Sequence, residues 1–220
     1  RPPPRRPCCS RPAREPSPPP PFFVSPPPPP PAPPPPPPGS HSHSLSLFQS
    51  QTGQWVVVAT ADTEASTVYC LPVNAGSSRS PQPRWEYVTG GSVVASPTIF
   101  FSKRLQLELV IVGSLDRSLY CFVLDGGRLL WNLTLGDSIY GTVALLADGE
   151  TGYVGSADHR LYAFNASSGT ILWNYTAPAA IRSSAAIDEN NNRLFFTSTG
   201  SVASLLFALD LTGRELLVNE

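Results

Sequence analysis

Apolar and polar residues alternate in short runs along the chain from about residue 54 onward, and turn residues separate the runs. In one segment the runs cover 92–100, 107–114, 118–125 and 128–135. Alternation over such lengths predicts half-buried β-strands. Asp125-Gly126-Gly127 separates the last two runs, and glycine tolerates the positive φ angles of a tight hairpin. The pattern therefore predicts a unit of four short strands.

This unit recurs along the chain. Gly113 and Gly155 are 42 residues apart, and so are Trp131 and Trp173. A period in the forties with β-rich content and a late tryptophan is typical of propeller blades. We therefore predict an all-β fold, a partial β-propeller of about four four-stranded blades. The expected blades cover about 51–90, 91–136, 137–179 and 180–220.

The first and last copies are irregular. A longer polar loop, 77–83, precedes Trp85 in the first copy, while Thr197 and Leu217 replace the glycine and the tryptophan in the last. The last copy remains apolar at 205–207 and 216–218. Since a blade buries its apolar face only against a neighbour, we expect an open array whose final blade causes association.

The N-terminal segment has a different composition. Of the 27 prolines, 22 lie within the first 38 residues. Proline runs favour polyproline II, and the only sizeable apolar cluster is 22–24. We predict that residues 1–50 form a disordered proline-rich arm. Because the chain opens on Arg1 without a methionine, we expect it to be a fragment of a larger protein.

Charge and hydropathy exclude two classes of partner. The arm carries five arginines and Glu15, so the rest of the chain is mildly acidic, given the net charge of −1. Without a basic stripe, nucleic-acid binding is not expected. No apolar run approaches 18 residues, so no membrane span is predicted.

The cysteines and the glycosylation sequons favour different compartments. Cys70 and Cys121 occupy the same place in successive copies, where we expect small buried side chains and not a disulfide. Cys8 and Cys9 lie in the arm. This usage favours the cytoplasm. The alternative is secretion, because sequons begin at Asn132, Asn165 and Asn174.

A motif in the third copy is the most specific in the chain. Ala163-x-Asn165-x-x-Ser168-Gly169-x-x-x-Trp173 resembles the tryptophan-docking motif A-x-D-x-x-T-G-x-x-x-W of the pyrroloquinoline-quinone-like (quinoprotein) propeller repeat. The resemblance implies that Trp131 and Trp173 are largely buried between blades. The expected structural repeat residues are Trp85, Gly113, Cys121, Gly127, Trp131, Gly155, Ala163, Asn165, Gly169, Trp173, Ala208, Asp210 and Gly213.

A narrower resemblance concerns three longer runs. RWEYVTGGSVVASP, WNLTLGDSIYGTVA and AIRSSAAIDENNNRLFF are similar to the C-terminal propeller of the aminoadipate-semialdehyde dehydrogenase-like (beta-alanine-activating enzyme) family. In that family an adenylation domain and a carrier domain precede the propeller. The resemblance implies that any such chemistry belongs to segments upstream of this chain.

Quinone-dependent dehydrogenases resemble this chain in their repeat, and they need a calcium site and an aspartate base. Asp116 and Asp158 are the best acidic candidates, but they recur at one turn position, which favours an Asx turn. His41 and His43 have no carboxylate or cysteine nearby, and His159 is expected to be exposed in a turn. We predict no catalytic, cofactor-binding or metal-binding residue, and no cofactor.

These observations favour a non-catalytic binding or scaffold module. The expected partner is another protein, or the remaining blades of a larger, acyl-activating chain. The alternative is a fragment of a quinone-dependent oxidoreductase, which the adjacent Cys8 and Cys9 match only by their adjacency.

Overall fold

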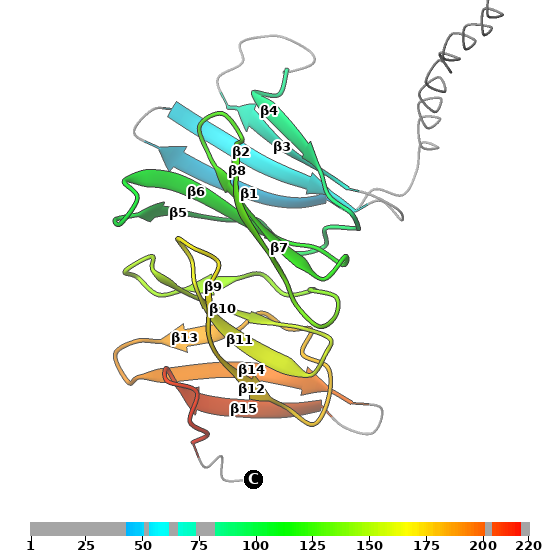
Figure 1. Cartoon of the computed structure of the whole chain (residues 1–220), viewed down its shortest axis with the longest axis vertical. Coiled ribbons are helices and arrows are strands. Elements are labelled where there is room, and N and C mark those ends of the chain that lie inside the picture. Colours follow the sequence, from blue (N-terminus) through cyan, green and yellow to red (C-terminus); the bar gives the residue numbers. More distant parts are fainter. Residues whose placement is uncertain (1–42, 51–52, 62–65, 74–81, 201–203, 217–220) are drawn as a thin grey trace, which may run out of the picture. The chain divides into compact units, whose positions relative to one another are not determined.

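The computed structural model describes residues 43–50, 53–61, 66–73, 82–200 and 204–216. The described residues belong to the unit Gly39–Glu220. They form four antiparallel sheets, which follow one another in chain order (Figure 1). The predicted all-β fold of propeller-like blades is confirmed, and we call the sheets blades one to four.

Each blade is a meander in which every strand pairs with the next. Blade one consists of β1 (His43–Ser50), β2 (Gly53–Thr60), β3 (Thr67–Pro72) and β4 (Trp85–Val88). Blade two consists of β5 (Thr98–Ser102), β6 (Leu107–Gly113), β7 (Ser118–Val123) and β8 (Leu129–Thr134). Blade three consists of β9 (Ala144–Leu145), β10 (Thr151–Gly155), β11 (Arg160–Asn165) and β12 (Ile171–Thr176). Blade four consists of β13 (Ala186–Asp188), β14 (Arg193–Thr199) and β15 (Ser204–Asp210). We name the strand positions within a blade A to D.

Blade one begins earlier than its composition indicates. β1 occupies His43–Ser50, inside the range predicted to be disordered, and pairs with β2 in a hairpin that closes at Ser50 and Gly53. Alternating leucines in HSLSLFQS suit a strand, although its serines resemble the preceding arm. The rest of the predicted arm, 1–42, lies outside the described residues.

Blade four has three strands in the described part of the chain, where four were expected. Strand D is represented by one bridge between Leu209 and Glu215 and by the bond from Leu216 N to Ala208 O, 2.8 Å. Residues 217–220 lie outside the described residues.

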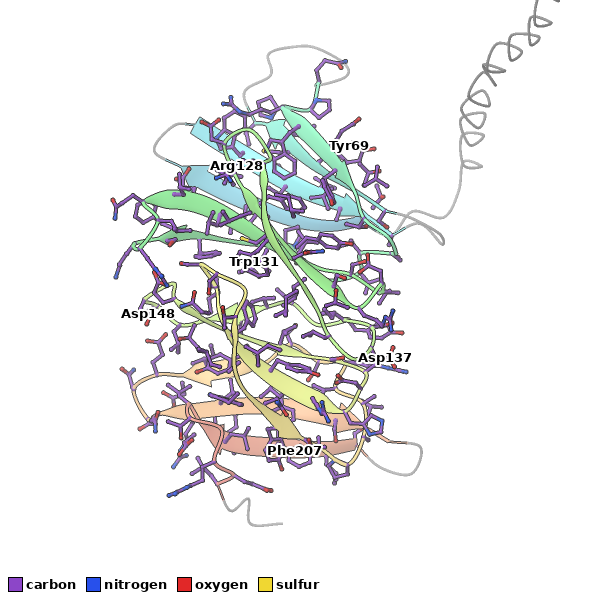
Figure 2. All side chains as sticks on the ribbon, in the orientation of Figure 1. Tyr69, Arg128, Trp131, Asp137, Asp148 and Phe207 are labelled. Atoms are coloured by element: carbon purple, nitrogen blue, oxygen red, sulfur yellow. The ribbon has the colours of Figure 1, made fainter. Side chains whose placement is uncertain are left out.

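Three apolar clusters hold the blades together, and each cluster lies between two consecutive blades. The alternation of strand side chains explains this arrangement. In β6, Val110 and Val112 belong to the cluster shared with blade one, while Leu109 and Ile111 belong to the cluster shared with blade three. Side chains thus fill the space on both faces of the middle blades (Figure 2).

Candidate functional site

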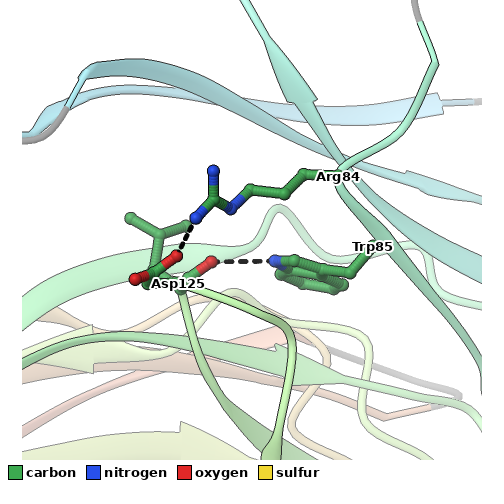
Figure 3. Close-up of polar contacts among 4 residues, drawn as sticks. Arg84, Trp85 and Asp125 are labelled. Atoms are coloured by element: carbon green, nitrogen blue, oxygen red, sulfur yellow. Dashed lines mark hydrogen bonds and ion pairs between the residues drawn. The ribbon is translucent and has the colours of Figure 1, made fainter.

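In blades one to three, a tryptophan of strand D docks on the next blade. The Trp85 indole Nε1 donates a 2.8 Å hydrogen bond to the Leu124 carbonyl, beside an ion pair between Arg84 and Asp125 (Figure 3). The ring covers Gly127, whose φ is +67°, and a Cβ there would lie 2.4 Å from the indole. Only glycine therefore fits under the ring at this turn.

The contact between ring and glycine recurs at the next two interfaces, and the indole hydrogen bond recurs at the first of them. Trp131 Nε1 donates to the Ala166 carbonyl, 3.1 Å, and the ring covers Gly169, while Trp173 covers Gly213. One repeat motif thus serves two interfaces, because Gly169 receives the preceding tryptophan and Trp173 docks on the following blade. Trp85 is 8% exposed, whereas Trp131 and Trp173 are partly exposed, so burial is less complete than expected for these two.

A small residue lies opposite each docking tryptophan on its own blade. The pairs are Cys70–Trp85, Cys121–Trp131 and Ala163–Trp173. Both cysteines are free and completely buried, as predicted for small apolar side chains. Burial raises the pKa of Cys70 to about 11 and also raises the pKa of Cys121. Neither thiol is a nucleophile near neutral pH.

Asp116 and Asp158 stabilise equivalent turns between strands B and C. Asp116 Oδ1 accepts from Ser118 N, 2.9 Å, and Asp158 Oδ1 accepts from Arg160 N, 3.0 Å. The other oxygens accept from the Tyr120 and Tyr162 hydroxyls, at 2.7 and 2.6 Å. Burial and the Asp116 hydrogen bond raise the pKa of Tyr120 to about 12. The predicted Asx turns are confirmed.

These turns also bind the chain that links the blades, which sequence reasoning missed. The Ser114 hydroxyl donates to Gly91 O, 3.1 Å, and the Ser156 hydroxyl donates to Asp137 O, 3.0 Å. Asp158 Oδ2 also accepts from Gly136 N, 3.0 Å. The recurrence of Gly-Ser-x-Asp at 113–116 and 155–158 was the available signal.

The repeat glycines of strand B give room to the next linker. A Cβ at Gly113 would lie 2.6 Å from Ile139, and a Cβ at Gly155 would lie 2.2 Å from Ile181. Thr197 occupies the equivalent position of blade four. Blade four therefore lacks the notch that receives the isoleucine.

A third set of contacts joins the residues that lie two positions before neighbouring A strands, and we call them the A-strand contacts. Ser96 N donates to Thr142 Oγ1, 3.1 Å, and Thr142 N donates to Ser184 Oγ, 2.9 Å. These three residues are therefore equivalent positions in blades two, three and four. They form a row of hydrogen bonds from blade to blade.

The contacts described so far are similar from blade to blade. The residues two positions before Ser96, Thr142 and Ser184 differ between blades in their chemistry. Val94, Tyr140 and Arg182 hold equivalent positions, and we call them the linker rim. Val94 is 41% exposed, Arg182 is exposed and Tyr140 is partly exposed. The Arg182 guanidinium lies 5.1 Å from the centre of the Tyr140 ring. The linkers and the A–B turns lie at opposite ends of blade three, where Asp137 and Asp148 are labelled (Figure 2).

The described residues do not fit a quinone and calcium site. Both carboxylate oxygens of Asp116 and of Asp158 accept hydrogen bonds from nearby protein groups, and the two residues lie in different blades. Within the described ranges, no three histidine, cysteine or acidic side chains form a metal-binding group. His159 is exposed, as expected, while His41, Cys8 and Cys9 lie outside the described residues.

The remaining predicted residues lie on strand D or at C–D turns. Asn132 and Asn174 are exposed on β8 and β12. Asn165 Oδ1 accepts from Ser167 N, 3.1 Å, and Asp210 Oδ1 accepts from Thr212 N, 2.9 Å, so both shape the turns that receive tryptophans. In the part of the chain that is described, no helix has the length and hydropathy of a membrane span.

Comparisons with known proteins agree with this architecture. The PQQ_2 family model, described as outer membrane protein assembly factor BamB, matches residues 105–217, just over half of the chain. BamB from Moraxella catarrhalis is similar with a TM-score of 0.57 and 19% identity, over 78% of this chain and 48% of that chain. Saccharomyces cerevisiae Sqt1 is similar with a TM-score of 0.62 and 13% identity, over 80% of this chain and 47% of that chain. The chain thus spans about half the length of these two structures. No match was found among curated proteins.

Proposed function

The chain belongs to the PQQ_2 family of propeller repeats, and we propose that it works as a non-catalytic binding module. The linker rim carries this proposal. At most positions that join blades one to three, equivalent residues keep the same chemistry, as the docking tryptophans and the glycines beneath them do. At the rim, three equivalent exposed positions hold valine, tyrosine and arginine. Since the fold does not need this variety, recognition of a partner is its best explanation.

The chemistry of the rim indicates its partner. Arg182 presents a guanidinium, which binds carboxylates through two parallel hydrogen bonds. Tyr140 and Val94 add amphipathic and apolar surface within the same row of linkers. We therefore propose a protein partner that presents a carboxylate beside an apolar side chain.

Photo-crosslinking in cells tests the proposal. A benzophenone amino acid at position 140 should trap a partner that the same group at Leu172 does not trap, because Leu172 is exposed on β12, away from the rim. Binding of the purified partner should then fall roughly 30-fold or more in Arg182→Glu. Equal trapping at the two positions, or unchanged binding by Arg182→Glu, would contradict the proposal. If the protein reduces a dye only after quinone and calcium are added, the proposal of a non-catalytic module is wrong.

We further propose that the module is part of a larger acyl-activating protein of the aminoadipate-semialdehyde dehydrogenase-like family. The three sequence runs between 84 and 196 support this narrower relationship. The full-length transcript tests it, because an upstream adenylation domain is required.

We also propose that the protein is cytoplasmic. The exposed Asn132 and Asn174 support the secreted alternative, which a glycan on either residue would establish.

A further inference from the structure

The A–B turn of blade two carries two cations and two large apolar side chains. Phe101 is 46% exposed and Leu105 is 36% exposed, and the side chains of Lys103 and Arg104 are exposed as well. We call these four residues the blade-two turn. Within the described ranges, neither cation forms an ion pair with an acidic side chain. Unpaired positive charge and exposed apolar surface therefore occur together on one turn.

The equivalent turns of blades three and four have a different chemistry. The strand register makes Phe101 equivalent to Ala147 and Glu189. The segments 147–150 and 189–192 contain no cation and no large apolar side chain. The turn between strands A and B therefore forms without the side chains that blade two exposes there.

A buried serine fixes the backbone of the blade-two turn. Ser102 is completely buried, and its Oγ lies 2.7 Å from Ser167 Oγ of blade three and accepts from Leu105 N, 3.1 Å. Ser102 O accepts from Gln106 N, 2.8 Å, and Gln106 Nε2 donates to Lys103 O, 2.6 Å. These bonds use only backbone atoms of Lys103 and Leu105. The turn is thus ordered before a partner arrives, which lowers the entropy cost of binding.

Acidic side chains of the next blade bind the backbone of the turn and leave its cations available. Glu150 Oε1 accepts from Arg104 N, 3.3 Å, and Glu150 Oε2 accepts from Ser167 Oγ, 3.0 Å. Glu189 of blade four likewise accepts from Ala147 N of blade three. These bonds place the A–B turns of blades two, three and four side by side (Figure 1). The basic blade-two turn is therefore next to acidic turns.

We propose that the blade-two turn binds an acidic protein segment that carries apolar side chains between its carboxylates. Lys103 and Arg104 supply the opposite charge, which selects the partner and speeds its approach. Phe101 and Leu105 supply apolar surface that the segment would cover. The linkers lie at the opposite end of the blades, so this inference does not depend on the linker rim.

The charges of the neighbouring turns favour a protein segment over a membrane surface. Asp148 of blade three and Glu189 of blade four are both exposed on the turns that follow the blade-two turn. A flat surface of anionic lipids would meet all three turns and would be repelled by two of them. A narrow segment can contact the blade-two turn alone.

Fluorescence anisotropy of a labelled peptide tests the proposal on the complete 220-residue chain. The peptide has the order Glu-Asp-Leu-Phe-Asp-Glu, and the chain carries Arg182→Glu so that the linker rim cannot contribute. In this chain we expect Lys103→Glu/Arg104→Glu to weaken binding roughly 30-fold or more. Phe101→Ser/Leu105→Ser should weaken it roughly 10-fold or more. Circular dichroism of each variant checks that the blades remain folded.

Two controls separate a specific contact from general attraction. Arg160→Glu/Arg193→Glu changes the net charge equally at exposed residues of blades three and four, and should leave binding unchanged. Lys103→Gln/Arg104→Gln adds no carboxylate beside Glu150, and should lower affinity in the same direction but by a smaller factor. A peptide with Gln and Asn in place of its acidic residues should not bind.

Each other outcome overturns the proposal in a distinct way. If the peptide binds the wild-type chain but not the Arg182→Glu chain, its site is the linker rim. Equal weakening in Arg160→Glu/Arg193→Glu shows that the attraction is not specific to the turn. If the chain binds vesicles of phosphatidylserine and phosphatidylcholine through Lys103 and Arg104 but does not bind the peptide, the partner is a membrane. Absence of peptide binding to either chain shows that the blade-two turn does not recognise acidic segments.

Discussion

Removing the Trp85 indole is the most direct test of how the blades are held. In Trp85→Ala the large ring leaves its place between Gly127 and Phe122, whose ring centre lies 5.5 Å away, and the Leu124 carbonyl loses its donor. Truncation of a buried aromatic costs about 3–5 kcal/mol. Trp85→Phe keeps most of the apolar contact but leaves the buried carbonyl unpaired, which costs about 1–3 kcal/mol.

Urea unfolding followed by circular dichroism measures both effects, because removing a tryptophan changes the fluorescence directly. With a denaturant slope of about 1–3 kcal/mol per molar, Trp85→Ala should lower the midpoint by roughly 1–5 M. Leu172→Ala is the control, because its side chain is 52% exposed and should cost less than about 0.5 kcal/mol. If Trp85→Ala unfolds at the same urea concentration as Leu172→Ala, the indole does not hold blades one and two together.

Three further predictions concern other contacts. Gly155→Ala should cost about 1–3 kcal/mol because its Cβ would lie 2.2 Å from Ile181, and Ile181→Ala in the same chain should reverse part of this loss in a double-mutant cycle. The thiols of Cys70 and Cys121 should not react with a disulfide reagent at neutral pH, because both are buried and burial raises the pKa of Cys70 to about 11. Reaction should begin only when the chain unfolds. Rapid reaction in a Cys8→Ser/Cys9→Ser chain would contradict the burial of both thiols. Deleting residues 1–38 should leave the urea midpoint unchanged, and a clear decrease would show that the arm contacts the blades.

The repeat made the blades predictable, but not every contact between them. Gly127, Gly169 and Trp173 follow from a period and a motif, because a contact that recurs leaves a pattern in the sequence. Strand β1 was missed because its serines continue the polar composition that precedes it.

Contacts between blades were harder to predict than contacts within one repeat. Ser114 and Ser156 bind linker carbonyls 23 and 19 residues earlier, and nothing in a serine shows such a partner. The partial exposure of Trp131 does not follow from residue type either, because Trp85 holds the equivalent place in the edge strand β4 and is only 8% exposed. Residue type indicates docking, but position in the array sets the extent of burial.

Each apolar cluster joins only two neighbouring blades, so each blade is stabilised by its immediate neighbours alone. Stability is then a sum of blade terms and nearest-neighbour terms, and the units with one neighbour are the first to fray. Amide exchange should be slowest in β6, β7, β10 and β11 and fastest in the outermost blades.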